Sequence, residues 1–126
     1  TRTLNHTLSR LAPLGVHLYV LQQPPLHKVR TIQIYQNLQT GLSDAALRNY
    51  SLTRAEYREQ QRHVEEAFAQ FKSRPDEVTF VYFEDLWCDA EVCPVGTAQQ
   101  PFYLDRHHLT AGKVRSLRPR IQKYLQ

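Results

Sequence analysis

The run Val16-His17-Leu18-Tyr19-Val20-Leu21 decides the fold class of this chain. It is short and nearly continuous in apolar residues, so it predicts a β-strand that is buried on both faces of a parallel sheet. Upstream of it, Leu4, Leu8 and Leu11 recur at helical spacing, and Gly15 stands where a helix C-terminal cap is expected. A helix followed by a buried strand is therefore predicted at the start of the chain.

The same order of helix and strand returns further along. A long connection from Pro24 through Gly41 has no definite predicted structure, and Thr53 followed by Glu56 then fits a capping box. The helix that begins there is expected to bury one apolar face. That face carries Tyr57, Val64, Phe68 and Phe71. The apolar run 78–83 predicts a second strand.

A last helix is marked by an apolar spacing that ends at the C-terminus. Its apolar positions are Val114, Leu117, Ile121 and Leu125. Pro119 is expected to bend this helix or to sit in a break. The order helix, strand, helix, strand, helix predicts an α/β layer with a parallel sheet. Because two strands make a thin sheet and parallel sheets are covered on both faces, we expect a partner half outside this sequence.

Length and charge set further bounds. The 126 residues amount to one domain at most and contain no methionine, so we expect them to be part of a longer protein. No apolar run approaches the roughly 20 residues that span a bilayer. The net charge is +4, which suits either an anionic partner or a solvated helix face. Without a nucleic-acid motif, no nucleic-acid partner is expected. Basic residues gather near the C-terminus at Arg106, Lys113, Arg115, Arg118, Arg120 and Lys123.

The two cysteines, Cys88 and Cys93, have neither the spacing of a redox pair nor a second pair to complete a zinc site. A short disulfide that pins a loop is the better account, and it implies an oxidising compartment. Two free thiols are the alternative. Trp87, beside Cys88, contacts a sugar ring, packs over the disulfide or fills the core. Glu84 and Asp85 follow a strand end, where they face a ligand crevice, cap a helix or are exposed to solvent.

The stretch Tyr103-Leu104-Asp105-Arg106-His107-His108-Leu109-Thr110 carries the chemistry. Asp105 stands three residues before His108, a spacing that lets a carboxylate accept from one ring nitrogen. The other nitrogen can then take a proton from a serine. The alternatives are a surface turn before a helix cap, and a metal site at His107 and His108. Adjacent side chains are expected to point apart, which disfavours the metal site.

Taken in order, these segments resemble the C-terminal half of an SGNH/GDSL-type hydrolase domain. The nearest likeness is the version attached to bacterial membrane O-acetyltransferases that modify lipopolysaccharide or other surface glycans. The matching pieces are residues 15–20 leading to Gln23-Pro24-Pro25, the strand into Phe83-Glu84-Asp85-Leu86, the Cys88–Cys93 loop and the block 103–110. The resemblance implies a three-layer α/β/α, flavodoxin-like domain with a parallel sheet. Residues 1–126 would form its C-terminal portion, with the N-terminal portion missing.

In that family the last block supplies the Asp and His of a catalytic triad. Carried over, Asp105 is the orienting carboxylate and His108 the general base, because its spacing and the following Leu109-Thr110 match better than those of His107. The implied reaction is acyl transfer through an acyl-serine, with a sugar hydroxyl or water as acceptor and no cofactor. The implied partners are a membrane acyltransferase domain that brings the acetyl donor, and a polysaccharide acceptor. The implied location is the periplasm, tethered to the inner membrane by segments outside this sequence.

The nucleophile is the main departure from the family. Its Gly-Asp-Ser block has no counterpart here, and the nearest serines, Ser43 and Ser51, lie in or beside the long connection. We therefore expect the nucleophile on the upstream part of the same domain, and residues 1–126 alone to be inactive. A carbohydrate O-acetyl esterase, or a non-catalytic glycan-binding or assembly module that lost its serine, are the alternatives.

Overall fold

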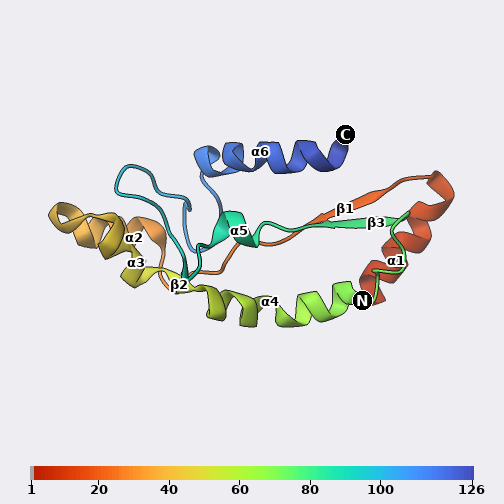
Figure 1. The fold of residues 1–126 in the computed structure, drawn as a ribbon, viewed down its shortest axis with the longest axis horizontal. Coiled ribbons are helices and arrows are strands. Elements are labelled where there is room, and N and C mark those ends of the chain that lie inside the picture. Colours follow the sequence, from red (N-terminus) through yellow and green to blue (C-terminus); the bar gives the residue numbers. More distant parts are fainter. Residues whose placement is uncertain (1) are drawn as a thin grey trace. The chain divides into compact units, whose positions relative to one another are not determined.

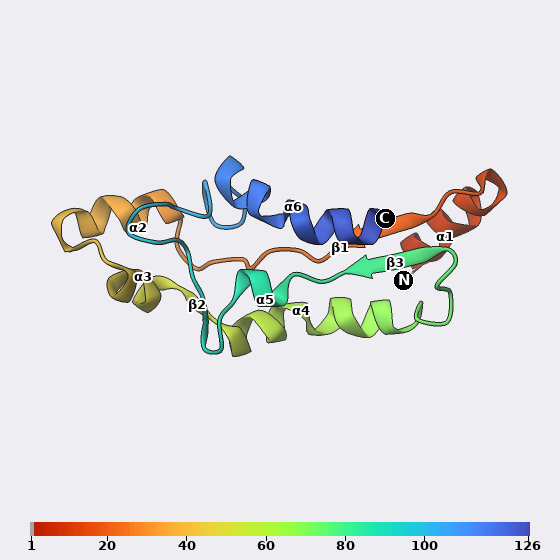
Figure 2. The ribbon, with the colours of Figure 1, turned by 45° about the horizontal axis from the view of Figure 1, so that its top comes forward.

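Strands β1 (Leu18–Leu21) and β3 (Val78–Val81) form a parallel pair. In the register Leu18 lies opposite Val78, and Leu21 lies opposite Val81. The structure is a computed structural model and describes residues 2–126. The two strands run side by side in Figure 1 and in the turned view of Figure 2. This pairing, between flanking helices, confirms the predicted α/β class with a parallel sheet.

The chain divides into two compact units, each built from two segments. Unit 1 comprises Thr1–Gln22 and Gln61–Tyr82, and unit 2 comprises Gln23–Gln60 and Phe83–Gln126. Helix α4 (Arg54–Ala69) begins in unit 2 and ends in unit 1. The parallel strand pair belongs to unit 1, whereas the Asp105–His108 block belongs to unit 2.

Unit 1 opens with helix α1 (Arg2–Leu11) and the short 3-10 helix η1 (Ala12–Leu14). Gly15 ends η1 in the left-handed region, at φ 64°, where a side chain would be strained. The predicted cap is therefore confirmed. The core of this unit is formed by Leu8, Phe71 and Val78, with Leu4, Leu18, Val20 and Phe80 packed against it.

The burial of β1 differs from the prediction. Leu18 and Val20 pack on the core, but Tyr19 and Leu21 are 40% and 49% exposed. The prediction that both faces are buried is therefore wrong for the described residues. The reason is the alternation of strand side chains, since one face meets α1 and the end of α4 while the other face has no described cover.

Unit 2 holds the remaining elements, several of them short. They are α2 (Thr31–Leu38), the 3-10 helix η2 (Gln39–Gly41), α3 (Asp44–Tyr50), β2 (Leu52–Thr53), α5 (Glu84–Trp87), β4 (Val92–Cys93) and α6 (Ala111–Leu125). The long connection without a predicted structure thus contains α2, and α3 follows it. Ile34, Leu47 and Val95 form a core cluster there. β2 and β4 add an antiparallel pair that the sequence did not predict.

The start of α4 confirms the capping box. The backbone N–H of Thr53 donates to Glu56 Oε2 at 2.8 Å, and the backbone N–H of Glu56 donates to Thr53 Oγ1 at 3.1 Å. Two N–H groups that lack helical partners are satisfied in this way. Tyr57 follows on the apolar face and is fully buried, as predicted.

Helix α6 begins at an N-cap supplied by Thr110, whose hydroxyl accepts from the backbone N–H of Lys113 at 3.3 Å. Pro119 lies inside the helix, which continues to Leu125. Of the two predicted alternatives, a bend or a break, the break is therefore absent. Proline removes one backbone donor from a helix interior, and in α6 the helix continues on both sides of it.

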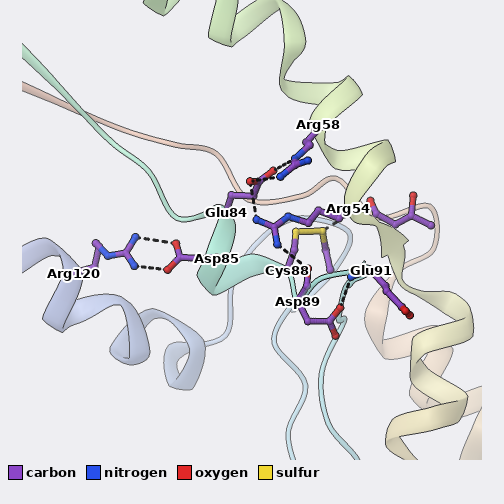
Figure 3. A network of polar contacts seen from close by, with 10 residues as sticks. Arg54, Arg58, Glu84, Asp85, Cys88, Asp89, Glu91 and Arg120 are labelled. Atoms are coloured by element: carbon purple, nitrogen blue, oxygen red, sulfur yellow. Dashed lines mark hydrogen bonds and ion pairs between the residues drawn. A yellow bond between two sulfur atoms is a disulfide. The ribbon is translucent and has the colours of Figure 1, made fainter.

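Two acidic residues of α5 join this short helix to α4 and α6 within unit 2, as Figure 3 shows. Glu84 accepts from Arg58 Nε at 2.8 Å and from Arg54 Nη2 at 3.0 Å. Asp85 accepts hydrogen bonds from both terminal nitrogens of Arg120, at 3.0 and 2.6 Å. Arg58, and then Arg54, hold the pKa of Glu84 below its usual value. These ion pairs give both carboxylates a structural partner in place of a ligand crevice.

Candidate active site

The Asp105–His108 block forms a small loop that closes on itself. Tyr103 and Leu109 form an antiparallel bridge. The N–H of Leu104 donates to the carbonyl of His108 at 2.7 Å, and the N–H of Thr110 donates to the carbonyl of Phe102 at 3.0 Å. Thr110 then caps α6. The loop therefore leads directly into the last helix, as the sequence predicts.

Asp105 and His108 are brought together inside this loop. His108 Nδ1–H donates to Asp105 Oδ2 at 2.6 Å. The other carboxylate oxygen, Oδ1, accepts from the backbone N–H groups of His107 and His108, each at 2.9 Å. These two amide bonds, followed by the His108 ring, hold the pKa of Asp105 far below its usual value. The carboxylate is thus an anion fixed in place, which orients the ring.

The other ring nitrogen of His108 is available for chemistry. Nε2 makes no hydrogen bond within residues 2–126. The side chain is 66% exposed, against 33% for Asp105. An imidazole with one nitrogen bound to a carboxylate and the other open is arranged to accept a proton.

Residues 27–31 form hydrogen bonds with the backbone and one side chain of this loop. Thr31 donates its backbone N–H to the Asp105 carbonyl at 3.0 Å and its hydroxyl at 2.9 Å. The N–H of His27 donates to the Arg106 carbonyl at 2.9 Å, and Arg106 Nε donates to the His27 carbonyl at 2.8 Å. No local sequence pattern predicts these contacts, because they join segments far apart in the chain.

Beneath the loop lie two buried rings that sequence reasoning missed. His27 and Tyr103 are 0% and 2% exposed, and their ring centroids lie 4.5 Å apart in an edge arrangement. Within the described residues, neither imidazole nitrogen of His27 nor the Tyr103 hydroxyl has a hydrogen-bond partner. Burial lowers the pKa of His27 to about 4 and raises that of Tyr103. His27 is therefore a neutral packing residue at neutral pH.

A hollow of about 820 Å³ opens beside His108. Its lining is mostly apolar and consists of Gln23, Pro24, Leu26, Leu104, His107, His108, Leu109 and Val114. Leu104 and Val114 are 63% and 49% exposed within it. The hollow thus offers apolar surface on which the carbon face of a substrate can lie, next to a base.

The neighbouring histidines do not point apart, so that expectation is wrong. Their rings lie 4.1 Å apart, and His107 Nδ1 is 3.8 Å from Asp105 Oδ1. The cause is the tight turn that aims both amides at one carboxylate. Asp105, His107 and His108 offer ligand atoms within 4.8 Å of one another, a grouping that could hold a cation. However, Asp105 and His108 are already joined by a hydrogen bond of 2.6 Å, which suits a carboxylate that orients an imidazole base.

The serines considered for the nucleophile both serve local structure. Ser43 Oγ accepts from the backbone N–H of Ala46 at 3.0 Å and so caps α3. Ser51 Oγ donates to the Leu47 carbonyl at 2.9 Å and accepts from the Val95 N–H at 3.1 Å. Neither arrangement resembles an activated hydroxyl, which would pair with a base.

Cys88 and Cys93 form a disulfide, which confirms the predicted bridge and excludes two free thiols. Figure 3 places it beside the Arg54 side chain. Trp87, next to Cys88, is 3% exposed and packs on Phe83 with ring centroids 5.5 Å apart. It is therefore a core residue in the described structure, and the sugar-contact alternative is wrong.

An α/β fold with an aspartate-oriented histidine before its last helix defines a class of hydrolase-like domains. The family model described as "SGNH domain (fused to AT3 domains)" matches residues 1–123, and the chain belongs to this family. No curated protein and no solved structure gives a significant match. Among residues 2–126, no helix combines the length and apolar character needed to cross a membrane.

Proposed function

We propose that this domain is part of an O-acetyltransferase that transfers acetyl groups to a bacterial surface polysaccharide, such as lipopolysaccharide. The observation that carries the proposal is the 2.6 Å bond between His108 Nδ1 and Asp105 Oδ2, with Nε2 left open beside a hollow. The membership of this chain in the family of SGNH domains fused to AT3 domains supports a role in acetyl transfer. The serine would come from a segment other than residues 1–126.

The chemistry follows from the two histidine nitrogens. In the first half-reaction, Nε2 takes the proton of the serine hydroxyl as its oxygen attacks the acetyl carbonyl. The carboxylate of Asp105 stabilises the imidazolium that forms. The tetrahedral intermediate then collapses, and the leaving group of the donor departs with the proton from Nε2. An acetyl-serine and a neutral His108 remain.

The second half-reaction runs the same steps with a sugar as nucleophile. A hydroxyl of the acceptor lies in the hollow beside His108 and loses its proton to Nε2 as it attacks the acetyl-serine. The serine oxygen leaves and recovers the proton from the imidazolium. The products are an acetylated sugar and the free enzyme, and the reaction needs no cofactor.

Location and partners complete the proposal. A disulfide is typical of proteins outside the reducing cytoplasm, which supports a periplasmic domain tethered to the inner membrane. The AT3 domain of the same protein would then deliver the acetyl donor from the membrane. The acceptor polysaccharide would reach His108 through the open side of the site.

The test is covalent labelling of the whole protein with a serine-directed fluorophosphonate, read by intact mass. We expect one adduct on the wild type and loss of rapid labelling in His108→Ala. His107→Ala is the matched control, because its ring neighbours His108 without donating to Asp105 Oδ2. A wild-type protein that never labels, or a His108→Ala variant that labels at the wild-type rate, would overturn the triad.

A further inference from the structure

A second hollow, of about 340 Å³, adjoins the site on the side of Arg30. Its lining is Leu26, Arg30, Asp105, Arg106 and His107. Two arginines and one aspartate therefore contribute to the lining of this hollow. That carboxylate is already occupied by two backbone amides and the His108 ring. The two arginines and the Asp105 carboxylate leave the lining of this hollow with one net positive charge.

Arg30 is the clearest source of this charge. It is exposed, immediately precedes α2, and its side chain makes no hydrogen bond or ion pair within residues 2–126. Four other arginines of unit 2 behave differently, whereas Arg115 and Arg118 are exposed on α6 and line neither hollow. Arg48, Arg54, Arg58 and Arg120 each pair with a carboxylate. An arginine that lines a hollow without such a partner is available to a ligand.

Arg106 is held in a fixed position beside it. Its Nε donates to the carbonyl of His27 at 2.8 Å, which fixes the plane of the guanidinium. Its two terminal nitrogens make no hydrogen bond within the described residues. A guanidinium whose outer edge is open matches the two oxygens of a carboxylate or phosphate in a bidentate geometry.

The two hollows share two lining residues. Leu26 and His107 belong both to the hollow beside His108 and to the hollow at Arg30. A chain of sugars that presents a hydroxyl to His108 can extend past Leu26 and His107 toward Arg30 and Arg106. An anionic group on the same or the next sugar would meet the two arginines.

We propose that Arg30 and Arg106 form an anion-binding subsite, and that the acceptor is an acidic glycan bearing carboxylate or phosphate groups. This inference rests on the proposed function, because it assigns the acceptor of the same site. The subsite would select acidic sugars and set their register against His108.

The test measures equilibrium binding and acetyl transfer separately, with the whole protein. The probes are a uronic-acid trisaccharide, its neutral methyl ester, and a neutral trisaccharide with and without a phosphate group. We expect the acidic forms to bind at least about tenfold more tightly than their neutral counterparts, as charge-assisted bonds do. We expect the preference to fall with added salt. The ester and phosphate arms show which anion the subsite accepts.

Three variants sharpen the test. Arg30→Gln should remove most of the acidic preference by raising Kd and KM about tenfold, with kcat nearly unchanged, and Arg30→Lys should restore part of it. Arg118→Gln is the matched control, because Arg118 is an exposed arginine of α6 that lines neither hollow. Equal binding of acid and ester, or a preference that Arg30→Gln leaves intact, would overturn the subsite. A higher KM for the acetyl donor alone would assign the arginines to the donor and also overturn it.

The two proposals fail in different ways. If every acceptor binds with the expected preference but none is acetylated, the transferase proposal fails and the anion subsite stands. If transfer occurs equally to neutral and acidic glycans, the transferase stands and the subsite fails.

Discussion

Thr31, which is fully buried in the first turn of α2, donates both its N–H and its hydroxyl to the carbonyl oxygen of Asp105. The two residues are 74 positions apart. The carboxylate of Asp105 orients His108, so the backbone position of Asp105 sets where the open Nε2 lies. Thr31 is therefore a positioning residue that acts through the loop and not on the substrate.

Replacing Thr31 by Val should remove the hydroxyl bond and keep the backbone bond. We expect the free energy of unfolding to fall by about 1 kcal/mol, measured by urea denaturation of the whole domain. The turnover number for an acetyl ester should also fall, while the KM changes little. Thr31→Ser, which keeps a hydroxyl, is the control and should recover both quantities. A Thr31→Val variant that loses stability with an unchanged turnover number would reduce Thr31 to a packing role.

The two oxygens of Asp105 have separable roles. Asp105→Asn keeps an acceptor for the amides of His107 and His108 but loses the negative charge that faces Nδ1. We expect the loop to stay folded and acetyl-ester turnover to fall about 10⁴-fold, as in a triad whose carboxylate becomes an amide. Asp105→Ala should lose the amide bonds as well and also lower the melting temperature. Comparable turnover in Asp105→Asn and the wild type would contradict the orienting role.

His27 predicts a pH dependence of stability with a definite sign. Its pKa is about 4 in the folded protein, below the 6.5 of an exposed histidine. The unfolded chain therefore binds more protons between these values, and stability is lost as pH falls from 6.5 toward 4. The full effect is about 3 kcal/mol for a shift of this size in a buried group.

The measurement is urea denaturation at a series of pH values above 5, where most carboxylates are still ionised. His27→Leu removes the titrating group, so its stability should change less over this range than that of the wild type. If the free energy of unfolding changed equally with pH in the two proteins, protonation of His27 would not destabilise the fold. His27 would then not be buried in solution.

The disulfide predicts two simple results. Cys88 and Cys93 are the only cysteines of the sequence, so native protein should resist alkylation until a reductant is added. Replacing both by Ala should lower the free energy of unfolding by roughly 2 kcal/mol, as the closure of a short loop suggests. Intact mass after alkylation gives the first result and urea denaturation gives the second. Rapid labelling of the untreated protein would contradict the bridge.

Much of the local structure could be predicted because its causes lie close together in sequence. The capping box at Thr53 and Glu56, the cap at Gly15 and the disulfide at Cys88 and Cys93 each depend on a few neighbouring residues. The contact between Asp105 and His108 is of the same kind. Local chemistry of this sort leaves few alternative arrangements.

The remainder depends on contacts that no local pattern contains. Helix α2 has no side-chain cap at Arg30, so its start gave no signal. The pairing of Leu52 with Cys93 joins two strands of two residues each, too short for a periodicity to show. The residues next to His27 in the sequence do not indicate that its ring is buried beside Tyr103. Tyr19 was predicted to be buried and is exposed. An apolar run shows that the residues of a strand are apolar, but it does not show which face of the strand is covered.

The loop from Phe102 to Thr110 has a consequence for the order of folding events. Its closing hydrogen bonds and the contact between Asp105 and His108 span at most eight residues. Contacts of such short range form within about microseconds, whereas parallel strands distant in sequence must first overcome the entropy of closing a long loop. The histidine should thus be oriented before β1 meets β3. Maturation of the domain should be limited by strand pairing and by oxidation of its cysteines, and not by assembly of the acid–base pair.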